Sequence, residues 1–322
     1  MKVLITGGAG YLGSTLTPLL LSQGYDVRVL DNLSCGGSSM LGFWCHPNFE
    51  FLRGDLRREG DVRAAVAGAD AVVHLAAIVG DSACARNREE AMAVNREGSI
   101  RLIEASQEAK VDRFLFASTC SNYGKMGDAA ELVNEVSELH PVSLYADTKV
   151  AVEQHVMGSD PADLCAVSMR FSTLFGVSPR MRFDLTVNQF TAELATRRAL
   201  KIFGEQFWRP YVHVHDAARA IDHILRAERG SVAGQVFNIG DTAENYRKSQ
   251  IVDLIKEQLA FEPMIERVRQ ESDPRDYRVS FEKIRTALGY RITRTVPDGI
   301  REVLSLLREG VITDFADPAY SN

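Results

Sequence analysis

A glycine-rich turn directly after the first apolar run constrains the fold more than any other feature. Gly7, Gly10 and Gly13 follow the apolar segment Val3–Thr6 at intervals of three residues. The first glycine permits a tight turn, the second lets backbone N–H groups approach a pyrophosphate, and the third lets a new helix pack on the sheet. The start of that helix favours phosphate through its unpaired N–H groups and partial positive charge. The pattern therefore predicts a strand, a turn and a helix that bind a dinucleotide.

The first half of the chain alternates short apolar runs with longer amphipathic stretches. Continuous apolar runs are typical of strands buried on both faces of a parallel sheet. The predicted strands are Val3–Thr6, Val27–Asp31, Phe49–Gly54, Ala71–Leu75, Arg113–Ser118 and Cys165–Phe171. The predicted helices are Gly13–Gln23, Asp61–Val66, Arg88–Ala109 and Val142–Met157. This alternation predicts right-handed βαβ units and an α/β fold with a doubly wound, Rossmann-type parallel sheet.

The pattern becomes less regular after about residue 172. Helices are predicted at Leu185–Arg198, Ala217–Glu228 and Ser249–Leu259, and from Pro297 to Gly310. Strands are predicted at Lys201–Phe203, Pro210–Val214 and Val236–Ile239. There is no linker rich in Pro, Gly or Ser and no internal repeat. We expect a Rossmann domain at residues 1–172 and a smaller, interwoven substrate-binding domain at residues 173–322, with about residues 211–240 returning to pack on the first domain.

Composition limits the classes of partner. The 322 residues carry a net charge of -6, which does not favour nucleic acid or an anionic membrane. The N-terminal apolar stretch is too short for a signal peptide, and no run is long enough to span a membrane. Five cysteines without C-x-x-C spacing suit a reduced cytoplasm, and the seven histidines show no zinc-ligand pattern. We expect a cytoplasmic protein without a metal.

Two acidic residues end the second and third predicted strands. A carboxylate at Asp31 would accept hydrogen bonds from a ribose 2′-hydroxyl and repel a 2′-phosphate. Asn32, rather than Arg or Lys, comes next. The pattern therefore favours NAD over NADP, although Asp31 as a simple loop cap is an alternative. Asp55 is compatible with two roles. Its carboxylate either accepts a hydrogen bond from the adenine amino group or caps a turn.

Tyr145 and Lys149 lie four residues apart in a predicted helix, so they share one face. A free tyrosine has a pKa of about 10, which is too high for a base at neutral pH. A nearby ammonium and an oxidised nicotinamide both favour the phenolate. A decrease of about three pKa units requires roughly 4 kcal/mol of differential interaction. We therefore interpret Tyr145 as a general base and Lys149 as its cationic partner, against the alternative of a surface pair.

Polar residues follow the fifth predicted strand. Because the carboxyl ends of parallel strands face the ligand crevice, Ser118 or Thr119 is placed to hydrogen-bond a reacting oxygen. The alternative is a polar turn without a chemical role.

These residues resemble the extended short-chain dehydrogenase/reductase family, in its nucleotide-sugar epimerase and dehydratase branch, over almost the whole chain. The resemblance rests on Thr6–Gly13, Asp31-Asn32-Leu33, Gly54-Asp55-Leu56, His74-Leu75-Ala76-Ala77, Val94–Gly98, Ser118–Gly124, Tyr145–Lys149, Met169-Arg170-Phe171, Arg209–Asp216 and Phe237-Asn238-Ile239-Gly240. It implies NAD as cofactor, a nucleotide-diphosphate sugar as substrate and a homodimer.

The resemblance also implies roles for individual residues. Those implied for catalysis are Tyr145 as the base, Lys149 and Thr119. Those implied for the cofactor are Gly7, Gly10, Tyr11, Leu12, Gly13, Asp31, Asn32, Asp55, Leu56, Leu75, Ala76, Ala77, Asn95, Ser118 and Lys149. Those implied for the substrate are Thr119, Ser121, Asn122, Thr173, Asn188, Arg209 and Arg275. Arginine suits the sugar-nucleotide diphosphate because its planar fork pairs with phosphate oxygens.

Departures from the family pattern reduce the number of family reactions that this chain is expected to catalyse. Family dehydratases carry Asp-Glu after the catalytic Thr, whereas Cys120 and Ser121 stand there and cannot act as that acid/base pair at neutral pH. Cys120 is also one position away from the catalytic Cys of fucose-type epimerase-reductases, so we interpret it as a buried filler. Thr173 replaces an asparagine that many members have.

Two segments point to a rival reaction. Residues 170–182 and Asp273-Pro274-Arg275-Asp276-Tyr277 resemble a subgroup that acts on GDP-heptoses, in which some enzymes oxidise C4 without returning the hydride. Our first hypothesis is an NAD-dependent nucleotide-sugar epimerase that works through a transient 4-keto intermediate. The second is a C4 dehydrogenase with net oxidation. A 4,6-dehydratase and a non-catalytic NAD-binding protein are further alternatives, the last disfavoured by the intact Thr119, Tyr145 and Lys149.

Overall fold

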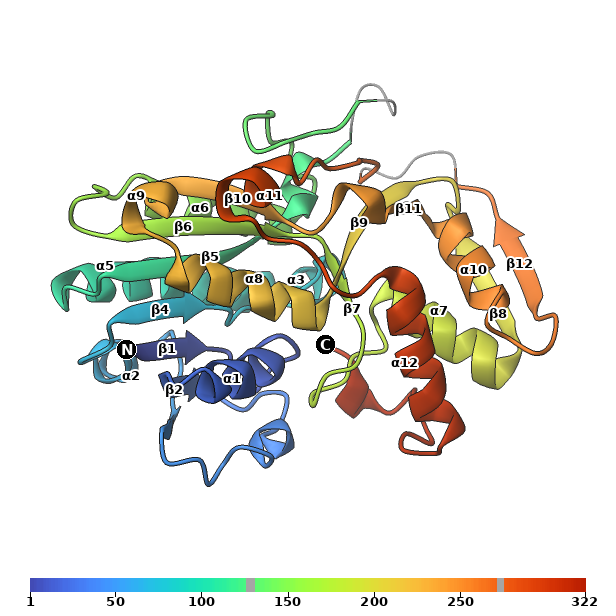
Figure 1. Ribbon diagram of the computed structural model, residues 1–322, viewed down its shortest axis with the longest axis horizontal. Coiled ribbons are helices and arrows are strands. Elements are labelled where there is room, and N and C mark those ends of the chain that lie inside the picture. The colour runs from blue at the N-terminus through green and yellow to red at the C-terminus, as the bar shows by residue number, and fades with distance from the viewer. Residues whose placement is uncertain (126–130, 271–274) are drawn as a thin grey trace.

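The buried apolar runs of the first half form one seven-stranded parallel sheet. The computed structural model describes residues 1–125, 131–270 and 275–322 (Figure 1). Neighbouring strands are parallel in the order β10-β6-β5-β4-β1-β2-β3. The strands are β1 (Lys2–Thr6), β2 (Asp26–Asp31), β3 (Phe49–Arg53), β4 (Ala71–His74), β5 (Arg113–Thr119), β6 (Cys165–Phe171) and β10 (Gln235–Ile239). The predicted doubly wound Rossmann sheet is confirmed.

Helices cover both faces of this sheet because successive strand residues point to opposite faces. In β1, Val3 and Ile5 pack in the layer of α1 and α8, whereas Leu4 packs in the opposite layer. The helices around the sheet are α1 (Gly13–Ser22), α2 (Glu59–Val66), α3 (Asp81–Arg86), α4 (Arg88–Met92), α5 (Ser99–Glu108), α6 (Leu144–Met157), α8 (Val214–Arg226), α9 (Arg229–Val232) and α11 (Glu282–Leu288). The two resulting cores cover the central strands of the sheet, whereas the edge strand β3 is only partly buried.

A smaller group of elements, on the right of Figure 1, packs around its own core. A three-stranded sheet has the order β11-β9-β7, and β12 pairs with β8 in parallel. The elements are β7 (Thr173–Phe175), α7 (Thr186–Ala192), β8 (Ala199–Phe203), β9 (Trp208–His213), β11 (Asn245–Arg247), α10 (Lys248–Lys256), β12 (Met264–Val268) and α12 (Val296–Arg308). Short 3-10 helices lie at Ser38–Met40, Cys120–Tyr123, Thr242–Glu244 and Pro318–Tyr320.

Most predicted elements are present with shifts of a few residues at their ends. β10, from the second half of the chain, pairs with β6 at the edge of the large sheet. The division into domains at residue 172 itself stays a prediction. The sequence analysis did not predict β12, because its exposed Met264 and charged Glu266 and Arg267 hide the strand pattern.

Two predicted helices are interrupted by π-helical turns. The stretch Arg88–Ala109 becomes α4, a π-helical turn at Ala93–Gly98 and α5. The stretch Leu185–Arg198 becomes α7 and a π-helical turn at Glu193–Arg197. Such turns cluster at functional sites, and the first of them carries Asn95, whose contacts are described below.

A buried ion pair fastens α6 to the sheet. Arg170 Nη2 lies 2.6 Å from Glu153 Oε1, and the two side chains are only 6% and 5% exposed. Ser168 donates to the other Glu153 oxygen at 2.7 Å. Arg170 also donates to the hydroxyl of Tyr123, which donates in turn to Asn238. The network therefore joins β6 and β10 to α6 and to the turn after β5.

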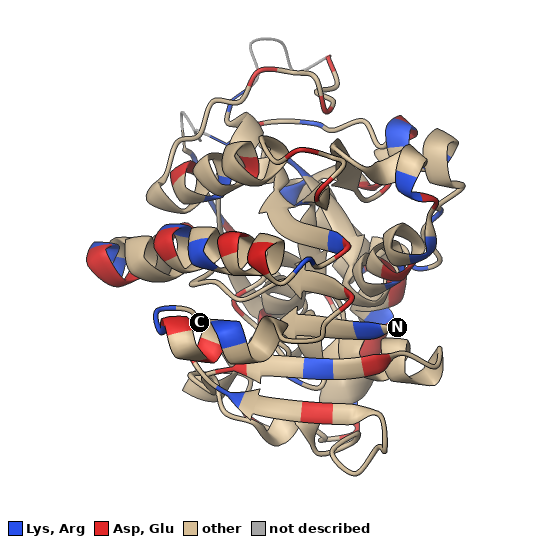
Figure 2. Ribbon diagram, turned by 90° about the vertical axis from the view of Figure 1, so that its left-hand side faces the viewer, with Lys and Arg blue, Asp and Glu red and all other residues tan. Residues whose placement is uncertain are grey.

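Acidic and basic residues both occur along the elements on the side of the ribbon that Figure 2 shows. This mixture gives that face no extended field of one sign, in keeping with the small net charge of the chain. Within the described parts of the chain, no helix has the length and apolar character needed to cross a membrane.

Removing one partner of the buried ion pair tests its role. Glu153→Leu leaves the Arg170 guanidinium buried without its counter-charge, so we expect the free energy of unfolding to fall by about 3–5 kcal/mol. Urea denaturation measures this change. Glu104→Leu, at an exposed position of α5, is the matched control and should stay within about 0.5 kcal/mol of the wild type. Equal stability of the two variants would contradict the prediction.

Candidate active site

The glycine turn lies where the strand order reverses. β1 has β2 on one side and β4 on the other, and ligands of doubly wound sheets bind at such a switch point. Gly7 has φ +76°, and a Cβ on it would lie 2.8 Å from the backbone of Ala76. A Cβ on Gly13 would lie 2.2 Å from the Gly7 carbonyl oxygen. A Cβ on Gly10 would meet, among the described residues beyond its chain neighbours, just the same carbonyl at 3.2 Å, which leaves this glycine open to an approaching pyrophosphate.

Asp31 lies beside this turn. Its carboxylate accepts hydrogen bonds from the backbone N–H of Ala9 at 3.0 Å and of Leu33 at 2.8 Å. Burial raises the pKa of Asp31, and the two backbone hydrogen bonds oppose that effect. These bonds hold the carboxylate next to the glycine turn, where a ribose hydroxyl is expected.

Asp55 has a different environment from Asp31. Arg57 Nη2 lies 2.7 Å from an Asp55 oxygen, and the amide of Asn32 donates to the same oxygen at 3.2 Å. The hydrogen bond from Arg57 is the main cause that lowers the pKa of Asp55. Asn32 and Asp55 therefore meet at the carboxyl ends of β2 and β3, and Leu56 next to them is buried. Their contacts with an adenine remain a prediction.

A histidine that the sequence analysis left without a role connects β1, β4 and α5. His74 Nδ1 lies 2.7 Å from Thr6 Oγ1, and Nε2 lies 2.8 Å from Ser99 Oγ. Ser99 donates its proton to the Asn95 carbonyl, so Nε2 of His74 donates to Ser99 and Thr6 donates to Nδ1. Burial, followed by the charge of Lys149, lowers the pKa of His74 to about 3. The ring is therefore neutral.

This hydrogen-bond chain positions the loop after β4. Thr6 Oγ1 accepts from the N–H of Ala76, and Leu75 donates to the Thr6 carbonyl. Asn95 accepts from the N–H of Ile78 at 2.8 Å and donates to its carbonyl at 2.9 Å. The residues predicted to bind the cofactor therefore lie together. The loop after β4 contains Leu75, Ala76 and Ala77, and Asn95 supports it. Asn95 acts on this loop through the backbone rather than as an exposed side chain.

Tyr145 and Lys149 share one face of α6, as predicted. The helix begins after Ser143, whose hydroxyl accepts from Ala146 N and donates to Asp81. Lys149 Nζ lies 5.9 Å from the centre of the Tyr145 ring and donates to the Ala117 carbonyl of β5 at 2.8 Å. The pair therefore lies beside the carboxyl end of β5.

Burial shifts the pKa values of both residues toward their neutral forms. It raises the pKa of the half-buried Tyr145 above its ordinary value, and the charge of Arg182 opposes this. It lowers the pKa of Lys149 to about 8. The expected effect of the neighbouring ammonium on Tyr145 is therefore outweighed by burial in the protein alone. A bound pyridinium cation would favour the phenolate.

The turn after β5 brings together the predicted polar residues. Thr119 accepts from the N–H of Ser121 at 3.1 Å, and the amide of Asn122 donates to Ser118 at 3.1 Å. Asn122 is fully buried, whereas Ser121 accepts a longer hydrogen bond, 3.4 Å, from Tyr277. Thr119 and Ser121 are therefore closer to the accessible side of the turn than Asn122.

Cys120, in the same turn, is buried against β6. Its side chain is 1% exposed, and the thiol donates to the Arg170 carbonyl at 3.1 Å. Burial raises its pKa well above the ordinary value. The interpretation of Cys120 as a buried filler is confirmed.

Three residues predicted to contact the substrate lie on the side of the smaller sheet. Arg209 on β9 donates to the Trp208 carbonyl, and its guanidinium lies 5.6 Å from the centre of the Tyr277 ring. Thr173 begins β7 and pairs in register with β9. Arg275 forms an ion pair with Asp81 at 2.8 Å, which ties it to α3 near Tyr145. Asp273 and Pro274, from the same motif as Arg275, lie outside the described residues.

Asn188 has a structural environment that the sequence analysis did not anticipate. Its side chain is fully buried and donates to the hydroxyl of Tyr11 and to the Arg182 carbonyl. Its oxygen accepts from the N–H of Gly176 at 2.9 Å. A contact between Asn188 and a substrate would break these bonds, so the amide acts on the site by fixing Tyr11 and residues 176–182. Tyr11 donates to the Gly176 carbonyl, and both it and Leu12 are buried.

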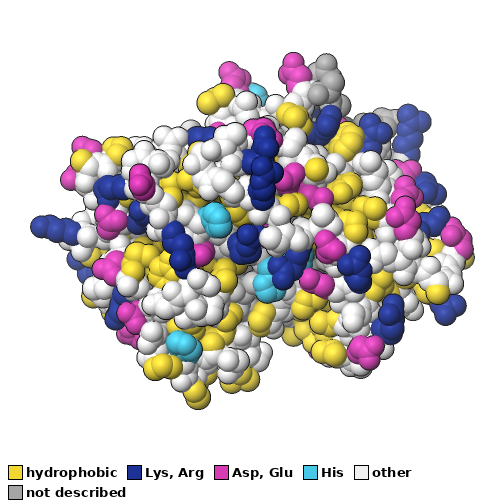
Figure 3. All heavy atoms as spheres, in the orientation of Figure 1, with side chains coloured by type: hydrophobic (Ala, Val, Ile, Leu, Met, Phe, Trp, Pro, Cys, Tyr) yellow, Lys and Arg dark blue, Asp and Glu magenta, His cyan; other side chains and the backbone are white. Residues whose placement is uncertain are grey.

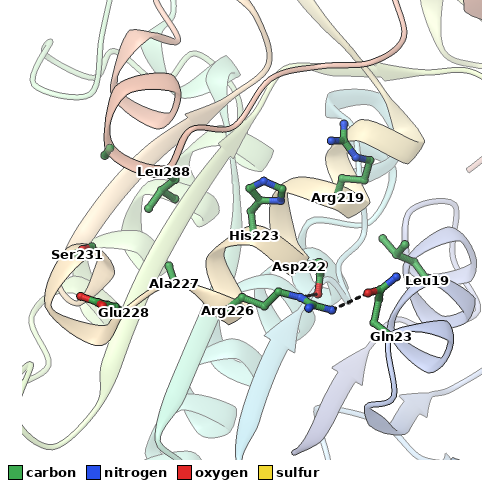
Figure 4. A pocket seen from close by; sticks show the side chains of 11 residues that line it. Leu19, Gln23, Arg219, Asp222, His223, Arg226, Ala227, Glu228, Ser231 and Leu288 are labelled. Carbon is green, nitrogen blue, oxygen red and sulfur yellow. Dashed lines mark hydrogen bonds and ion pairs between the residues drawn. The ribbon is translucent and has the colours of Figure 1, made fainter.

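A surface pocket of about 640 Å³ lies away from these residues, beside α8. Figure 3 shows that hydrophobic, acidic and basic side chains are mixed on the face where α8 lies. Figure 4 shows Arg226 bonded to Asp222 and to Gln23. Arg219, which is also drawn there, pairs with Asp216 of α8. Both arginines that line the pocket are therefore paired within the protein. Among the described residues, no group of three or more His, Cys, Asp or Glu is placed to hold a metal ion.

Comparison with known proteins identifies the family. Residues 3–240 match the family described as NAD dependent epimerase/dehydratase. The chain belongs to this epimerase/dehydratase family. The low-salt glycan biosynthesis protein Agl12 of Haloferax volcanii is 31% identical over 306 residues, which cover 93% of this chain and 96% of that protein. A UDP-glucose 4-epimerase of Corynebacterium glutamicum is 29% identical over 316 residues, 90% of each chain.

Solved structures of the epimerase/dehydratase family agree with this assignment. DesIV, a dTDP-glucose 4,6-dehydratase from Streptomyces venezuelae with NAD and TYD bound, has a TM-score of 0.85 at 25% identity and covers 96% of this chain and 98% of its own. A UDP-glucose 4-epimerase of Thermus thermophilus in complex with NAD has a TM-score of 0.83 at 26% identity and covers 97% and 100%. The cofactor of this epimerase/dehydratase is NAD, and the open Gly10 and the carboxylate of Asp31 fit it.

Replacing Asp31 tests the preference for NAD. Asp31→Asn removes the negative charge but keeps the size and part of the hydrogen bonding. We expect the ratio of the NADP to the NAD dissociation constant to fall by about tenfold or more, because the carboxylate no longer repels a 2′-phosphate. Titration of the ligand-free protein with both dinucleotides measures this ratio. An unchanged ratio would assign the discrimination to other residues.

The shifted pKa of Lys149 predicts how stability changes with pH. In the folded protein the pKa is about 8, against an ordinary 10.5. Between these values the unfolded chain binds a proton that the folded protein lacks, so this group's contribution to the free energy of unfolding rises with pH. Lys149→Met removes the titrating amine. We expect the stability of the wild type relative to the variant to rise by about 2–3 kcal/mol across this window, measured by urea denaturation. A constant difference would contradict the shift.

Proposed function

We propose that this chain is a nucleotide-sugar epimerase that inverts C4 through a transient 4-keto intermediate. The observation that carries the proposal is the placement of Tyr145 and Lys149 on one face of α6, beside the strand end that carries Thr119. The phenol of Tyr145, the ammonium of Lys149 and the hydroxyl of Thr119 are groups that suit the oxidation of a secondary alcohol. A protein that only binds NAD would need none of the three.

The turn after β5 supports epimerisation over 4,6-dehydration. Elimination of water needs an acid and a base near C5 and C6 of the sugar. In this turn Cys120 is buried against the Arg170 carbonyl with a raised pKa, and Ser121 carries an alcohol. Neither side chain is a proton donor or acceptor of the required strength at neutral pH.

A nucleotide-diphosphate sugar is the proposed substrate class. Arg209 on β9 and Arg275 near α3 supply guanidinium groups on the side of the smaller sheet. Structures of family members include a UDP-glucose 4-epimerase from Thermotoga maritima with UDP-glucose, which matches this chain at a TM-score of 0.83 and 26% identity. The identity of the base and of the sugar stays open.

Each of the three protein residues has a separate role in the proposed reaction. Thr119 holds the C4 hydroxyl, and Tyr145 removes its proton as the C4–H bond breaks. Bound NAD would supply the hydride acceptor for this oxidation and the hydride donor for the reduction that follows. Lys149 would hold the nicotinamide ribose and keep a positive charge near the phenolate. After the keto-sugar turns its other face, Tyr145 returns the proton to the oxygen, so that proton and hydride balance over one turnover.

A C4 dehydrogenase is the second candidate. The similarity of residues 170–182 and of the Arg275 segment to the GDP-heptose subgroup favours it. In that reaction the keto-sugar leaves before the hydride returns, and an outside acceptor must reoxidise the dinucleotide.

Incubation in heavy water with GDP-, UDP-, dTDP-, CDP- and ADP-sugars tests the proposal. Epimerisation should give the C4 epimer without solvent deuterium in the product, detected by mass spectrometry and NMR. Dehydration would introduce deuterium, and net oxidation would leave bound NADH with a keto product. Either of these outcomes would replace the proposed reaction.

Tyr145→Phe tests the base directly. It removes the hydroxyl but keeps the ring, so we expect the turnover number to fall by about 10²–10⁴-fold while bound NAD is retained. Tyr25→Phe is the matched control, because Tyr25 bonds to Asp222 on α8, outside the candidate site. It should keep wild-type turnover. Undiminished turnover of Tyr145→Phe would refute the mechanism.

A further inference from the structure

Arg182 is a cation that the protein holds in one orientation. It lies in the connection between β7 and α7, and its Nε and Nη2 donate to the two oxygens of Asp184 at 2.9 and 2.6 Å. Two parallel hydrogen bonds of this kind fix the plane of the guanidinium. The side chain of Arg182 is 10% exposed, against 32% for Asp184. Water therefore screens the carboxylate more than the guanidinium, so the two charges do not cancel inside the protein.

The backbone of Arg182 is joined to the glycine turn. Its carbonyl accepts from the amide of Asn188 at 2.9 Å, and the same amide donates to the hydroxyl of Tyr11 at 3.2 Å. In Figure 1 the connection between β7 and α7 lies between α1 and α12. Burial raises the pKa of Tyr11, and the charge of Arg182 opposes this. The guanidinium therefore lies near the glycine turn.

The side chain of the ion pair is joined to α3. The backbone N–H of Asn322 donates to the carboxylate of Asp184, and the Asn322 carbonyl accepts from Arg86 of α3 at 3.0 Å. The same helix is bonded to the start of α6, since Asp81 accepts from Ser143 at 2.6 Å. The ion pair therefore lies between the glycine turn and the end of α6 that carries the proposed base.

The groups around Tyr145 act on its hydroxyl in opposite directions. Burial, followed by the thiol of Cys84, raises the pKa of Tyr145. Asp81 and Tyr277 add to this effect, whereas the charge of Arg182 opposes it. Because a buried site has a low effective dielectric, a fixed cation there acts strongly on a nearby phenol.

Lys149 supplies a positive charge over a limited range of pH. Its Nζ donates to the Ala117 carbonyl at 2.8 Å and lies 4.8 Å from the centre of the Phe116 ring. Burial lowers the pKa of this amine to about 8, so it loses its charge above that pH. A guanidinium stays protonated throughout. Arg182 can therefore act on the phenol where the lysine no longer does.

We propose that Arg182, oriented by Asp184, is a positioning residue whose charge stabilises the ionised form of Tyr145. The inference rests on the proposed function, in which this phenolate removes the proton from the sugar hydroxyl. It needs no ligand at the guanidinium, because the effect acts through space.

Ultraviolet difference titration of the NAD-loaded protein tests Arg182 without a substrate. A phenolate absorbs at longer wavelength than a phenol, and subtraction of the matching Tyr145→Phe protein isolates this tyrosine. At a fixed pH below the midpoint, we expect Arg182→Gln to lower the phenolate fraction by about three- to tenfold, because a nearby cation is lost. Arg182→Lys should recover most of it, since it keeps the charge. Arg301→Gln, which removes the same charge from an exposed position of α12, should leave the fraction unchanged.

A variant of the counter-charge gives the opposite sign. Asp184→Asn removes the carboxylate that partly offsets the guanidinium, so the phenolate fraction should rise. General damage to the site would lower the fraction in both variants. This second variant also tests the proposal where Arg182→Gln does not fold.

Two results would overturn the role of Arg182. One is an unchanged phenolate fraction in Arg182→Gln, and the other is a fall of that fraction in Asp184→Asn. The pH profile of the turnover number should move to higher pH in Arg182→Gln. Because the titration involves no substrate, a shifted phenolate without C4 epimerisation would replace the proposed function and still support the action of Arg182 on Tyr145.

Discussion

The placement of the reactive groups depends on the ion pair between Glu153 and Arg170. Tyr145, Lys149 and Glu153 are spaced four residues apart, so they lie on one face of α6. Glu153 bonds to Arg170 and Ser168 of β6, and Lys149 bonds to a carbonyl of β5. These contacts fix the rotation of the helix about its axis. Because a buried charge without its partner is costly, a turn of α6 that would misplace the Tyr145 hydroxyl would also break the pair.

Burial sets the chemistry of the site as strongly as the neighbouring charges do. It raises the pKa of Tyr145 and lowers that of Lys149 to about 8, so each group is biased toward its neutral form. In such surroundings an added positive charge acts at a low effective dielectric and has a large effect on the phenol. In the proposed mechanism, ionisation of Tyr145 therefore depends on the oxidised cofactor being bound, which would link proton removal to the presence of a hydride acceptor.

The sequence predicted the large sheet well because its strands are short apolar runs bounded by turns. It predicted the glycine turn and the Tyr145–Lys149 pair because both follow local spacing rules. It did not reveal that Asn188 supports Tyr11, or that Arg180 meets Ser321, since these contacts join positions more than a hundred residues apart. It also missed His74 as the link between β1 and α5, because a lone histidine in an apolar strand carries no pattern.

The smaller group of elements is joined to the large sheet by short connections. β7 begins two residues after β6 ends, and α8 begins directly after β9. His213, at that second junction, is fully buried and bonds to Glu302 of α12 at 2.9 Å. A Cβ on Gly176 would lie 2.1 Å from its ring, so the ring packs directly against the backbone of Gly176. Arg209 is thus held at a nearly fixed position relative to the large sheet. Differences in substrate choice within the epimerase/dehydratase family should therefore arise from the side chains on these elements. Movement of the smaller group of elements against the large sheet should contribute little.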